Sequence, residues 1–425
     1  MTLTSTSGAP EPDVELAAEV FDTLAKHTSD GIGITRASYG EGEQFAHDLI
    51  AGIAEREGLS VNTDVAGNLY ITLAGTDPRE KASVIGSHLD SVPAGGNFDG
   101  AAGVLAGLAT VVTWKRHGFR GKGDVVVMAI RAEESPWFPY SYIGSKAAFG
   151  ILPSAALDIA RSDTGRSLAD HMSELGFDPD SVRKGVPYLR AQDLRAYIEL
   201  HIEQGPVLVE RQLPVGTVSG IRGSFRYREA KVLGEYAHSG AVPRAYRHDA
   251  VAAAADLVTR LNTNWRLLED AGRDLTVTVG KFSTNAQVHA FSKVAGEVDF
   301  CLDVRSHSSE VLEEMKKNVR THVADLERDY AVRFELGPIT GSEPAHMSRD
   351  LLAVLSRSYR ALGVPYFEMA CGAGHDAAVF AQQGVPTAML LVRNEGGSHN
   401  PGERMDIDDF IVAVRVLAHG LSQIA

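Results

Sequence analysis

Cysteine, long apolar runs and excess positive charge are all scarce in this chain. Only Cys301 and Cys371 occur among 425 residues, which excludes a disulfide framework and leads us to expect a reducing compartment such as the cytoplasm. No apolar run approaches the roughly 20 residues that a membrane-spanning helix requires. Residues 1–13 are polar and contain proline, so they lack the basic start and apolar centre of a signal peptide.

The charge balance is acidic. The chain has 41 basic and 55 acidic residues, a net charge of −14, which disfavours nucleic acid or an anionic membrane as a partner. Apolar residues make up 44% and charged residues 23% of the chain, as in ordinary globular proteins. The length exceeds what one hydrophobic core usually reaches, so we expect two domains.

Histidine and carboxylate side chains follow the first predicted buried strand. The apolar run at residues 82–86 predicts that strand, and the small aliphatic residues at 101–112 predict a buried helix. His88, Asp90 and Asp99 lie between the two. This is the carboxyl end of a strand, where ligands bind in open α/β sheets.

Two further predicted strands carry the same residue types. The run at 124–130 ends in Glu133 and Glu134, and adjacent carboxylates are costly to bury unless a cation neutralises at least one. Residues 197–204 alternate between apolar and ionisable side chains. The alternation places Ile198, Leu200 and Ile202 on one face and Glu199, His201 and Glu203 on the other.

A fourth segment, the loop at 394–401, presents His399 after the apolar run at 386–392. Taken singly, each of these signals is typical of an ordinary surface or core group. Together they offer nitrogen and carboxylate oxygen ligands without thiolate, which suits Zn²⁺, Mn²⁺, Co²⁺ or Ni²⁺ and argues against a cysteine-rich structural zinc site. Five of the residues, His88, Asp99, Glu134, His201 and His399, can close around a pair of divalent metal ions.

Five stretches of the sequence resemble the M20 metallopeptidase superfamily: SHLDSVPAGGNFDGAAGVLAGL, EES, IELHIEQGPVL, GAGHDAAVFA and GGSHNPGE. Within it they resemble the hydantoinase/carbamoylase branch, which includes allantoate amidohydrolases, N-carbamoyl-L-amino acid hydrolases and β-ureidopropionases. The resemblance extends from about His88 to the C-terminal helix. It implies one or two divalent ions per subunit, Mn²⁺ or Zn²⁺ with Co²⁺ or Ni²⁺ as alternatives. It also implies that His88, Asp99 and His201 ligate one side of the centre, that Asp99, Glu134 and His399 complete the other, and that Asp99 bridges.

The resemblance also implies roles for other residues. Glu133 would be the general base, and Asp90 would orient His88. His238 would reach across a homodimer to stabilise a developing oxyanion, although a strand-end histidine bonded to backbone is the plainer interpretation from the residues. Arg305 would grip a substrate carboxylate, for which the guanidinium fork is well suited. The remaining positions implied to contact substrate are Gln204, Ser292, which stands where relatives have asparagine, and Gly374.

The predicted fold is α/β: a mixed-sheet hydrolase domain for two metal ions, with an inserted ferredoxin-like α+β dimerisation or lid domain. The catalytic domain is predicted for 1–212 and 335–425 and the insert for 213–334. Within the insert we predict strands at 224–236, 275–282, 297–304 and 331–335 and helices at 248–265 and 309–327. His375 and Asp376 are interpreted as a capping pair at a helix start.

The changes from the family pattern lie around substrate recognition. Trp137, Phe138, Tyr140 and Tyr142 follow the two glutamates and either line a pocket for a flat group or pack in the core. Three functions remain open: hydrolysis of a linear non-peptide C–N bond in a small carboxylate-bearing substrate (N-carbamoyl amino acid, allantoate or ureido acid); aminoacylase, dipeptidase or aromatic aminohydrolase activity at the same centre; or a non-catalytic binding protein. Glu133 and the ligand set speak against the last, because binding alone would need neither.

Overall fold

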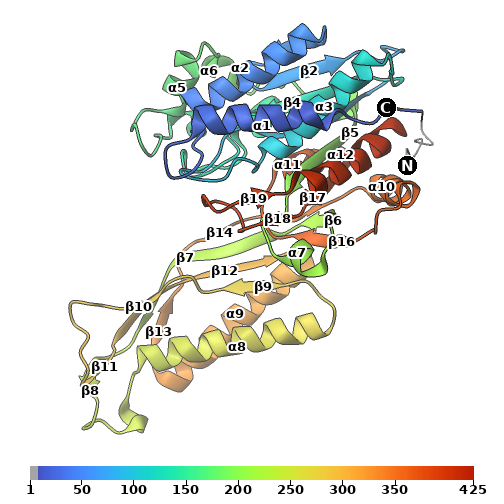
Figure 1. Cartoon of the computed structure of the whole chain (residues 1–425). Coiled ribbons are helices and arrows are strands. Elements are labelled where there is room, and N and C mark those ends of the chain that lie inside the picture. Colours follow the sequence, from blue (N-terminus) through green and yellow to red (C-terminus); the bar gives the residue numbers. More distant parts are fainter. Residues whose placement is uncertain (1–7) are drawn as a thin grey trace. The chain divides into compact units, whose positions relative to one another are not determined.

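The computed structural model describes residues 8–425 and divides into two compact units (Figure 1). One comprises the described residues up to Ser219 together with His346–Ala425, and the other is Gly220–Ala345. The first seven residues of the predicted non-signal N-terminus lie outside the described part. Within residues 8–425, no helix combines the length and apolar character needed to cross a bilayer.

A nine-stranded mixed sheet forms the centre of the first unit, in the order β1-β2-β4-β3-β5-β17-β6-β15, with β16 paired to β6. Its central strands β4, β3, β5 and β17 are parallel, so their carboxyl ends meet at one edge. The strands are β1 (Ser60–Thr63), β2 (Leu69–Leu73), β3 (Ala82–His88), β4 (Val125–Ile130), β5 (Leu194–Ile202), β6 (Val215–Ile221), β15 (Ala345–His346), β16 (Glu368–Cys371) and β17 (Thr387–Val392).

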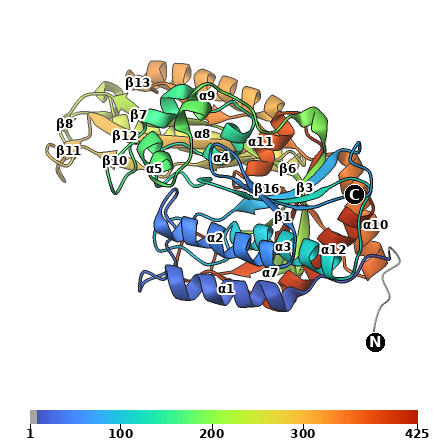
Figure 2. The ribbon, with the colours of Figure 1, turned by 90° about the horizontal axis from the view of Figure 1, so that it is seen from above.

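Helices cover both faces of this sheet (Figure 2). On one face, α3 (Ala101–Arg116) packs on β3 and β5 and shares the main apolar core with α1 (Val14–Thr28), α2 (Glu41–Arg56), α10 (Arg349–Leu362) and α12 (Ile407–Ser422). On the other face, α11 (Asp376–Gln382) packs on β5 and β17, and α4 (Ile143–Ala148) packs on α11. Smaller helices α5 (Leu168–Glu174), α6 (Pro179–Arg183) and α7 (Val207–Arg211) lie in the connections.

Strand β5 shows how the sequence pattern divides these faces. Ile198, Leu200 and Ile202 belong to the main core beneath α3, whereas the Glu199 carboxylate accepts a hydrogen bond from Ala377 N at the start of α11 (2.7 Å). The predicted alternation is confirmed. The small residues of α3 permit its close approach, because a Cβ on Gly103 would lie 2.2 Å from the Leu200 carbonyl oxygen.

The second unit is a separate antiparallel α+β unit, as predicted. Its six-stranded sheet has the order β10-β12-β7-β13, with β9 paired to β12 and β14 to β7. Helices α8 (Ala250–Asp270) and α9 (Ser309–Tyr330) pack on β7 and β12 and enclose a core of their own. The strands are β7 (Gly223–Leu233), β9 (Thr276–Thr278), β10 (Phe282–Thr284), β12 (Glu297–Ser306), β13 (Arg333–Glu335) and β14 (Ile339–Ser342), with β8 (Ala237–His238) and β11 (Lys293–Val294) forming a small ribbon.

The single strand predicted at 275–282 is wrong. The structure has two short strands, β9 and β10, which pair with different parts of β12. The pairing of β12 with β7 shifts register between Phe300 and Leu302. Strand β10 pairs with β12 before this irregularity and β9 pairs with it after the irregularity, so the two short strands are separated at that point. A local propensity pattern carries no information about such a bulge in the partner strand.

Candidate metal centre

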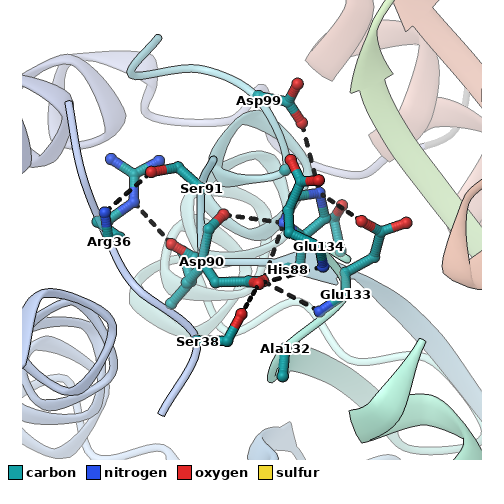
Figure 3. Close-up of polar contacts among 12 residues, drawn as sticks. Arg36, Ser38, His88, Asp90, Ser91, Asp99, Ala132, Glu133 and Glu134 are labelled. Atoms are coloured by element: carbon teal, nitrogen blue, oxygen red, sulfur yellow. Dashed lines mark hydrogen bonds and ion pairs between the residues drawn. The ribbon is translucent and has the colours of Figure 1, made fainter. Parts of the chain in front are cut away.

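The predicted ligands gather at the carboxyl edge of the parallel strands. His88 ends β3, Glu133 and Glu134 follow β4, His201 is the penultimate residue of β5, and His399 follows β17 through a loop. Asp99 lies in the loop that leads into α3. Because β4, β3, β5 and β17 are consecutive in the sheet, residues distant in sequence meet within one small region, part of which is shown in Figure 3.

The first ligand group consists of His88, Asp99 and His201, all buried. The Asp99 Oδ1 atom lies 3.4 Å from His88 Nε2 and 3.1 Å from His201 Nε2. The two imidazole nitrogens are themselves 3.4 Å apart. Three potential ligand atoms therefore surround one point.

The imidazole tautomers explain why a cation fits this point. His88 Nδ1 lies 3.0 Å from the Asp90 carbonyl oxygen, and His201 Nδ1 lies 2.9 Å from the Ile202 carbonyl oxygen. A carbonyl can only accept, so in the neutral rings Nδ1 carries the hydrogen and Nε2 presents a lone pair. Two buried lone pairs and a carboxylate oxygen that face one another repel unless a proton or a metal ion lies between them.

The second ligand group shares Asp99 with the first and adds Glu134 and His399. His399 Nε2 lies 3.3 Å from Glu134 Oε1 and 3.6 Å from Asp99 Oδ2. Asp99 thus presents Oδ1 to one group and Oδ2 to the other, the arrangement of a bridging carboxylate. The His399 side chain is 51% exposed, so this second position is open to solvent whereas the first is enclosed.

The donor set brings buried ionisable groups into close contact. Burial raises the pKa of the Glu134 carboxyl, and burial likewise raises that of Glu133 well above its usual value. The contact with the Glu134 carboxylate raises the pKa of His399 more than burial lowers it, to about 8. A divalent cation that replaces these protons stabilises the ionised form of the carboxylates and the neutral form of the histidine.

Asp90 supports the first group without belonging to it. Its Oδ1 atom lies 3.3 Å from His88 Nδ1. The carboxylate also accepts hydrogen bonds from Glu133 N and Glu134 N, both 3.1 Å, and from Ser38 Oγ at 2.6 Å. Figure 3 shows these bonds converging on a single carboxylate, which links the orientation of His88 to that of the two glutamates.

Glu403 is a supporting residue that the sequence analysis missed. Its buried carboxylate accepts from Phe98 N (2.9 Å), Asp99 N (3.3 Å) and Ser398 Oγ (2.8 Å). Gly96 makes this possible, because a Cβ there would lie 2.0 Å from Glu403 Cδ. Glu403 therefore ties the loop of Asp99 to the loop of His399. The available signal was its place in the stretch GGSHNPGE.

The interpretation of His375 and Asp376 as a side-chain capping pair is wrong. His375 stands at the N-cap of α11, but its side chain makes no capping bond. Its ring instead lies against the His201 ring, with centroids 4.4 Å apart, and its Nε2 atom is 3.2 Å from Cys371 Sγ. Asp376 accepts from Ser145 Oγ at 2.5 Å. Both side chains are buried in the wall of the candidate centre because α11 begins at that edge of the sheet.

Two of the four aromatic residues proposed for a pocket belong to the core. Trp137 donates to the Ser91 carbonyl oxygen (2.6 Å), and Phe138 is completely buried in a cluster with Tyr39 and Ile143. Tyr142 differs from them. Its amide donates to the Glu133 carbonyl oxygen (3.1 Å), and its hydroxyl would lie 1.8 Å from a Cβ on Gly374.

Gln204 and Gly374 are the predicted substrate-contacting residues of the first unit. Gln204 Nε2 donates to Asp99 Oδ2 at 2.7 Å, and the residue has a left-handed φ of 63°. Gly374 directly precedes His375 and has its Cα against the Tyr142 hydroxyl. Gln204 thus contacts the shared carboxylate, and Gly374 lies in the adjoining wall.

The remaining predicted site residues lie in the second unit. His238, at the end of β8, accepts from Gly240 N and Ala241 N (both 3.2 Å) through Nδ1. Ser292 is exposed, and its carbonyl oxygen accepts from Ser239 N (2.9 Å). Arg305 donates to Asp303 Oδ2 from Nε (3.1 Å) and Nη2 (2.8 Å). The interpretation of His238 as a histidine that is hydrogen-bonded to the backbone is therefore correct within the second unit. Because Nδ1 accepts these bonds, the hydrogen of the neutral imidazole lies on Nε2.

Replacement of Gly100 by alanine is expected to lower metal content. Gly100 has a φ of 67°, and a Cβ there would lie 2.5 Å from His88 Nδ1. The methyl group would displace the imidazole or unwind the start of α3, and either change moves a ligand. Metal content and the thermal midpoint should be measured for Gly100→Ala beside Gly118→Ala.

Gly118→Ala is the matched control because Gly118 has a φ of 69° and nothing within 4 Å of its Cβ position. It carries the backbone strain without the clash. Equal metal content in the two variants would contradict the importance of the His88 position.

Comparison with known proteins gives one consistent result. The profile of peptidase family M20/M25/M40 matches residues 84–423. An N-carbamoyl-L-amino acid amidohydrolase of Geobacillus stearothermophilus is 36% identical over 398 residues, covering 92% of this chain and 94% of the relative. The allantoate amidohydrolase of Escherichia coli (strain K12) is 33% identical over 370 residues, covering 87% of each. The crystal structure of a hydantoinase/carbamoylase family amidase from Burkholderia multivorans superposes with a TM-score of 0.88 at 28% identity, covering 98% of both chains.

Proposed function

The chain belongs to the hydantoinase/carbamoylase branch of peptidase family M20 and is an amidohydrolase of non-peptide C–N bonds. From this premise we propose that it uses one or two divalent metal ions to hydrolyse the ureido group of a small carboxylate-bearing substrate and to release ammonia. The substrates considered are N-carbamoyl amino acids, allantoate and related ureido acids. The relatives named above act on two of these classes.

The observation that carries the proposal is the pair of ligand groups joined by Asp99, with Glu133 beside them. His88, Asp99 and His201 would hold one ion, and Asp99, Glu134 and His399 the other. When bound, such ions act as Lewis acids that polarise a carbonyl and acidify water. Mn²⁺, Zn²⁺, Co²⁺ and Ni²⁺ all suit these nitrogen and oxygen donors.

Glu133 is proposed to move the proton. Its Oε2 atom lies 4.0 Å from His88 Nε2, close to the ligands but without the direct contact that Glu134 makes with His399. Oε2 would accept a proton from the attacking water and return it to the leaving nitrogen. For an N-carbamoyl amino acid, water adds to the carbonyl carbon and one C–N bond breaks to give the amino acid and carbamic acid, which then decomposes to carbon dioxide and ammonia.

His238 and Arg305 are proposed to complete the site from the second unit. Because the His238 Nδ1 atom accepts from two backbone amides, its Nε2–H can donate to an oxyanion. Arg305 would bind the substrate carboxylate, and Gln204, Ser292 and Gly374 would contact other parts of the substrate. A homodimer whose partner supplies His238 is part of this proposal.

Replacement of Arg305 by alanine is expected to raise KM for substrates with a free carboxylate, with a smaller effect on kcat, because it removes uniform binding. Arg226 provides the control, since it pairs with Asp303 Oδ1 (3.2 Å) on the neighbouring strand whereas Arg305 pairs with Oδ2. Steady-state kinetics of Arg305→Ala and Arg226→Ala should therefore differ. Similar KM values for both variants would remove Arg305 from substrate recognition.

Mixing of two inactive variants tests the shared site. If His238 acts across a dimer, His238→Ala and Glu133→Gln subunits should regain activity on exchange, because one site of each mixed dimer then has both wild-type residues. Ammonia release should be measured after exchange, with the mixed dimers shown by mass spectrometry. Mixed dimers without activity would place His238 in its own subunit's site or outside the site.

Ammonia release by Mn²⁺-loaded protein across three substrate classes tests the proposed function. The panel contains ureido acids, N-acyl amino acids and anthranilate-type amines. We expect ammonia from ureido acids. Turnover confined to N-acyl amino acids, measured as release of the free amino acid, would make the protein an aminoacylase. Ammonia released only from the aromatic amines would make it an aminohydrolase of that class.

A further inference from the structure

Ala132, directly before the two glutamates, has an unusual backbone conformation. Its φ is 51°, in the left-handed region that residues with a Cβ disfavour. The strand β4 ends at Ile130, so the turn at Ala132 sets the direction in which Glu133 and Glu134 leave the sheet. A conformation of this kind persists only where surrounding groups hold it.

Two buried carboxylates hold the three successive amides of this turn. Glu43 Oε1 accepts from Ala132 N at 2.9 Å. Asp90 accepts from Glu133 N and Glu134 N, both at 3.1 Å. Successive amides of an extended strand point in opposite directions, whereas here the last two point to one carboxylate; Figure 3 shows Ala132, Glu133 and Asp90 in this arrangement.

Glu43 is itself fixed by an enclosed set of donors. It lies in the first turn of α2 and is completely buried. Its Oε2 atom accepts from Tyr39 N (2.7 Å) and from Arg131 Nη1 (3.0 Å). Arg131 also donates to the Gly67 carbonyl oxygen (2.8 Å), and its guanidinium lies 4.8 Å from the centre of the Phe177 ring.

The carbonyl side of the turn is fixed as well. Tyr142 N donates to the Glu133 carbonyl oxygen and Ile143 N to the Ala132 carbonyl oxygen, both at 3.1 Å. Asp90 also contacts His88, so Asp90 and the hydrogen bonds it accepts from Glu133 N and Glu134 N are already part of the candidate centre. Glu43 makes no hydrogen bond or ion pair with the ligand groups, and its hydrogen bonds toward the site are those with Ala132 and Arg131.

We propose that Glu43 is a positioning residue for catalysis: it holds the left-handed turn at Ala132 and thereby directs Glu133 at the reacting water. This inference rests on the proposed role of Glu133 as the base. A buried carboxylate suits the task because it can accept from Ala132 N, Tyr39 N and Arg131 together, which an amide of the same shape cannot. A displacement of the base by about 1 Å is enough to slow an enzyme roughly 10²-fold.

The test compares Glu43→Gln with Glu41→Gln, an exposed glutamate of the same helix turn. For Glu43→Gln assayed with saturating Mn²⁺, we expect kcat on the best ureido substrate to fall about 10- to 100-fold, with KM near wild type. Glu41→Gln should behave as wild type. The decisive variant is Glu43→Gln/Ala132→Gly, because glycine adopts a positive φ without support and should restore most of the lost kcat.

A second comparison separates this inference from the proposed function. If Glu43 acts through Glu133, Glu43→Gln/Glu133→Gln should be no slower than Glu133→Gln alone. Full activity of Glu133→Gln would sink the base assignment itself, whatever Glu43 does.

Three results would overturn the positioning role: wild-type kcat in folded Glu43→Gln, no recovery with Ala132→Gly, or an additive loss with Glu133→Gln. Because Glu43→Gln leaves the buried Arg131 charge without its partner, Glu43→Gln/Arg131→Met, which removes both charges, should be assayed in parallel and read in the same way. Loss of folding in both variants that Ala132→Gly does not reverse would assign Glu43 to stability and also overturn the proposal.

Discussion

Removal of divalent metal ions is expected to abolish ammonia release, and Mn²⁺, Co²⁺, Ni²⁺ or Zn²⁺ is expected to restore it. The reason is the donor set: two imidazole nitrogens and an Asp99 oxygen meet at 3.1–3.4 Å, an arrangement that a divalent cation between them makes favourable. Activity should be measured after chelation and dialysis and again after each metal is added back.

Replacement of single ligands should lower metal occupancy to different degrees. His201→Ala removes an enclosed ligand, whereas His399→Ala removes a ligand whose side chain is 51% exposed. We therefore expect the larger loss of metal in His201→Ala. His117→Ala, an exposed histidine at the end of α3, is the control and should keep wild-type metal content. Full activity in metal-free protein would refute the metal centre.

Glu133→Gln is expected to lower kcat by about 10²-fold or more, the effect of lost acid–base catalysis, while metal content stays unchanged. The amide keeps the shape of the side chain and removes its basicity. The geometry separates the two neighbouring glutamates, because Glu134 lies 3.3 Å from His399 Nε2 whereas Glu133 lies 4.0 Å from His88 Nε2.

The adjacent variant Glu134→Gln is the control for this prediction. It should lose metal together with activity, since Glu134 belongs to the second ligand group. If Glu133→Gln loses metal instead, the two glutamates exchange roles, and Glu133 is a ligand.

The strands and the ligand-type residues could be predicted from sequence because their signals are local. Apolar runs marked β3 and β4, and alternation marked β5. Histidines and carboxylates at the ends of such strands meet at one edge of a parallel sheet whatever the connections are. The residue types at this edge could therefore be predicted from local patterns, whereas the choice of Asp99 over Asp90 and of Glu134 over Glu133 as ligands came from the resemblance to the M20 superfamily.

Two supporting residues, Glu43 and Glu403, could not be predicted because their positions depend on tertiary packing. Glu43 stands in the first turn of a surface helix beside Glu41, and nothing local distinguishes the buried glutamate from the exposed one. Glu403 acquires its role from a loop more than three hundred residues earlier in the chain. Only two residues separate Glu134 from Trp137 and Phe138, but the turn at Ala132 and the segment after it carry both rings into the core.

Anomalous X-ray diffraction from crystals of active, Mn²⁺-loaded protein tests the central claim most directly. We expect anomalous density between His88, Asp99 and His201, between Asp99, Glu134 and His399, or at both positions, with Asp99 in contact with every ion seen. Ions bound elsewhere in fully active protein, with no density at either position, would contradict the account.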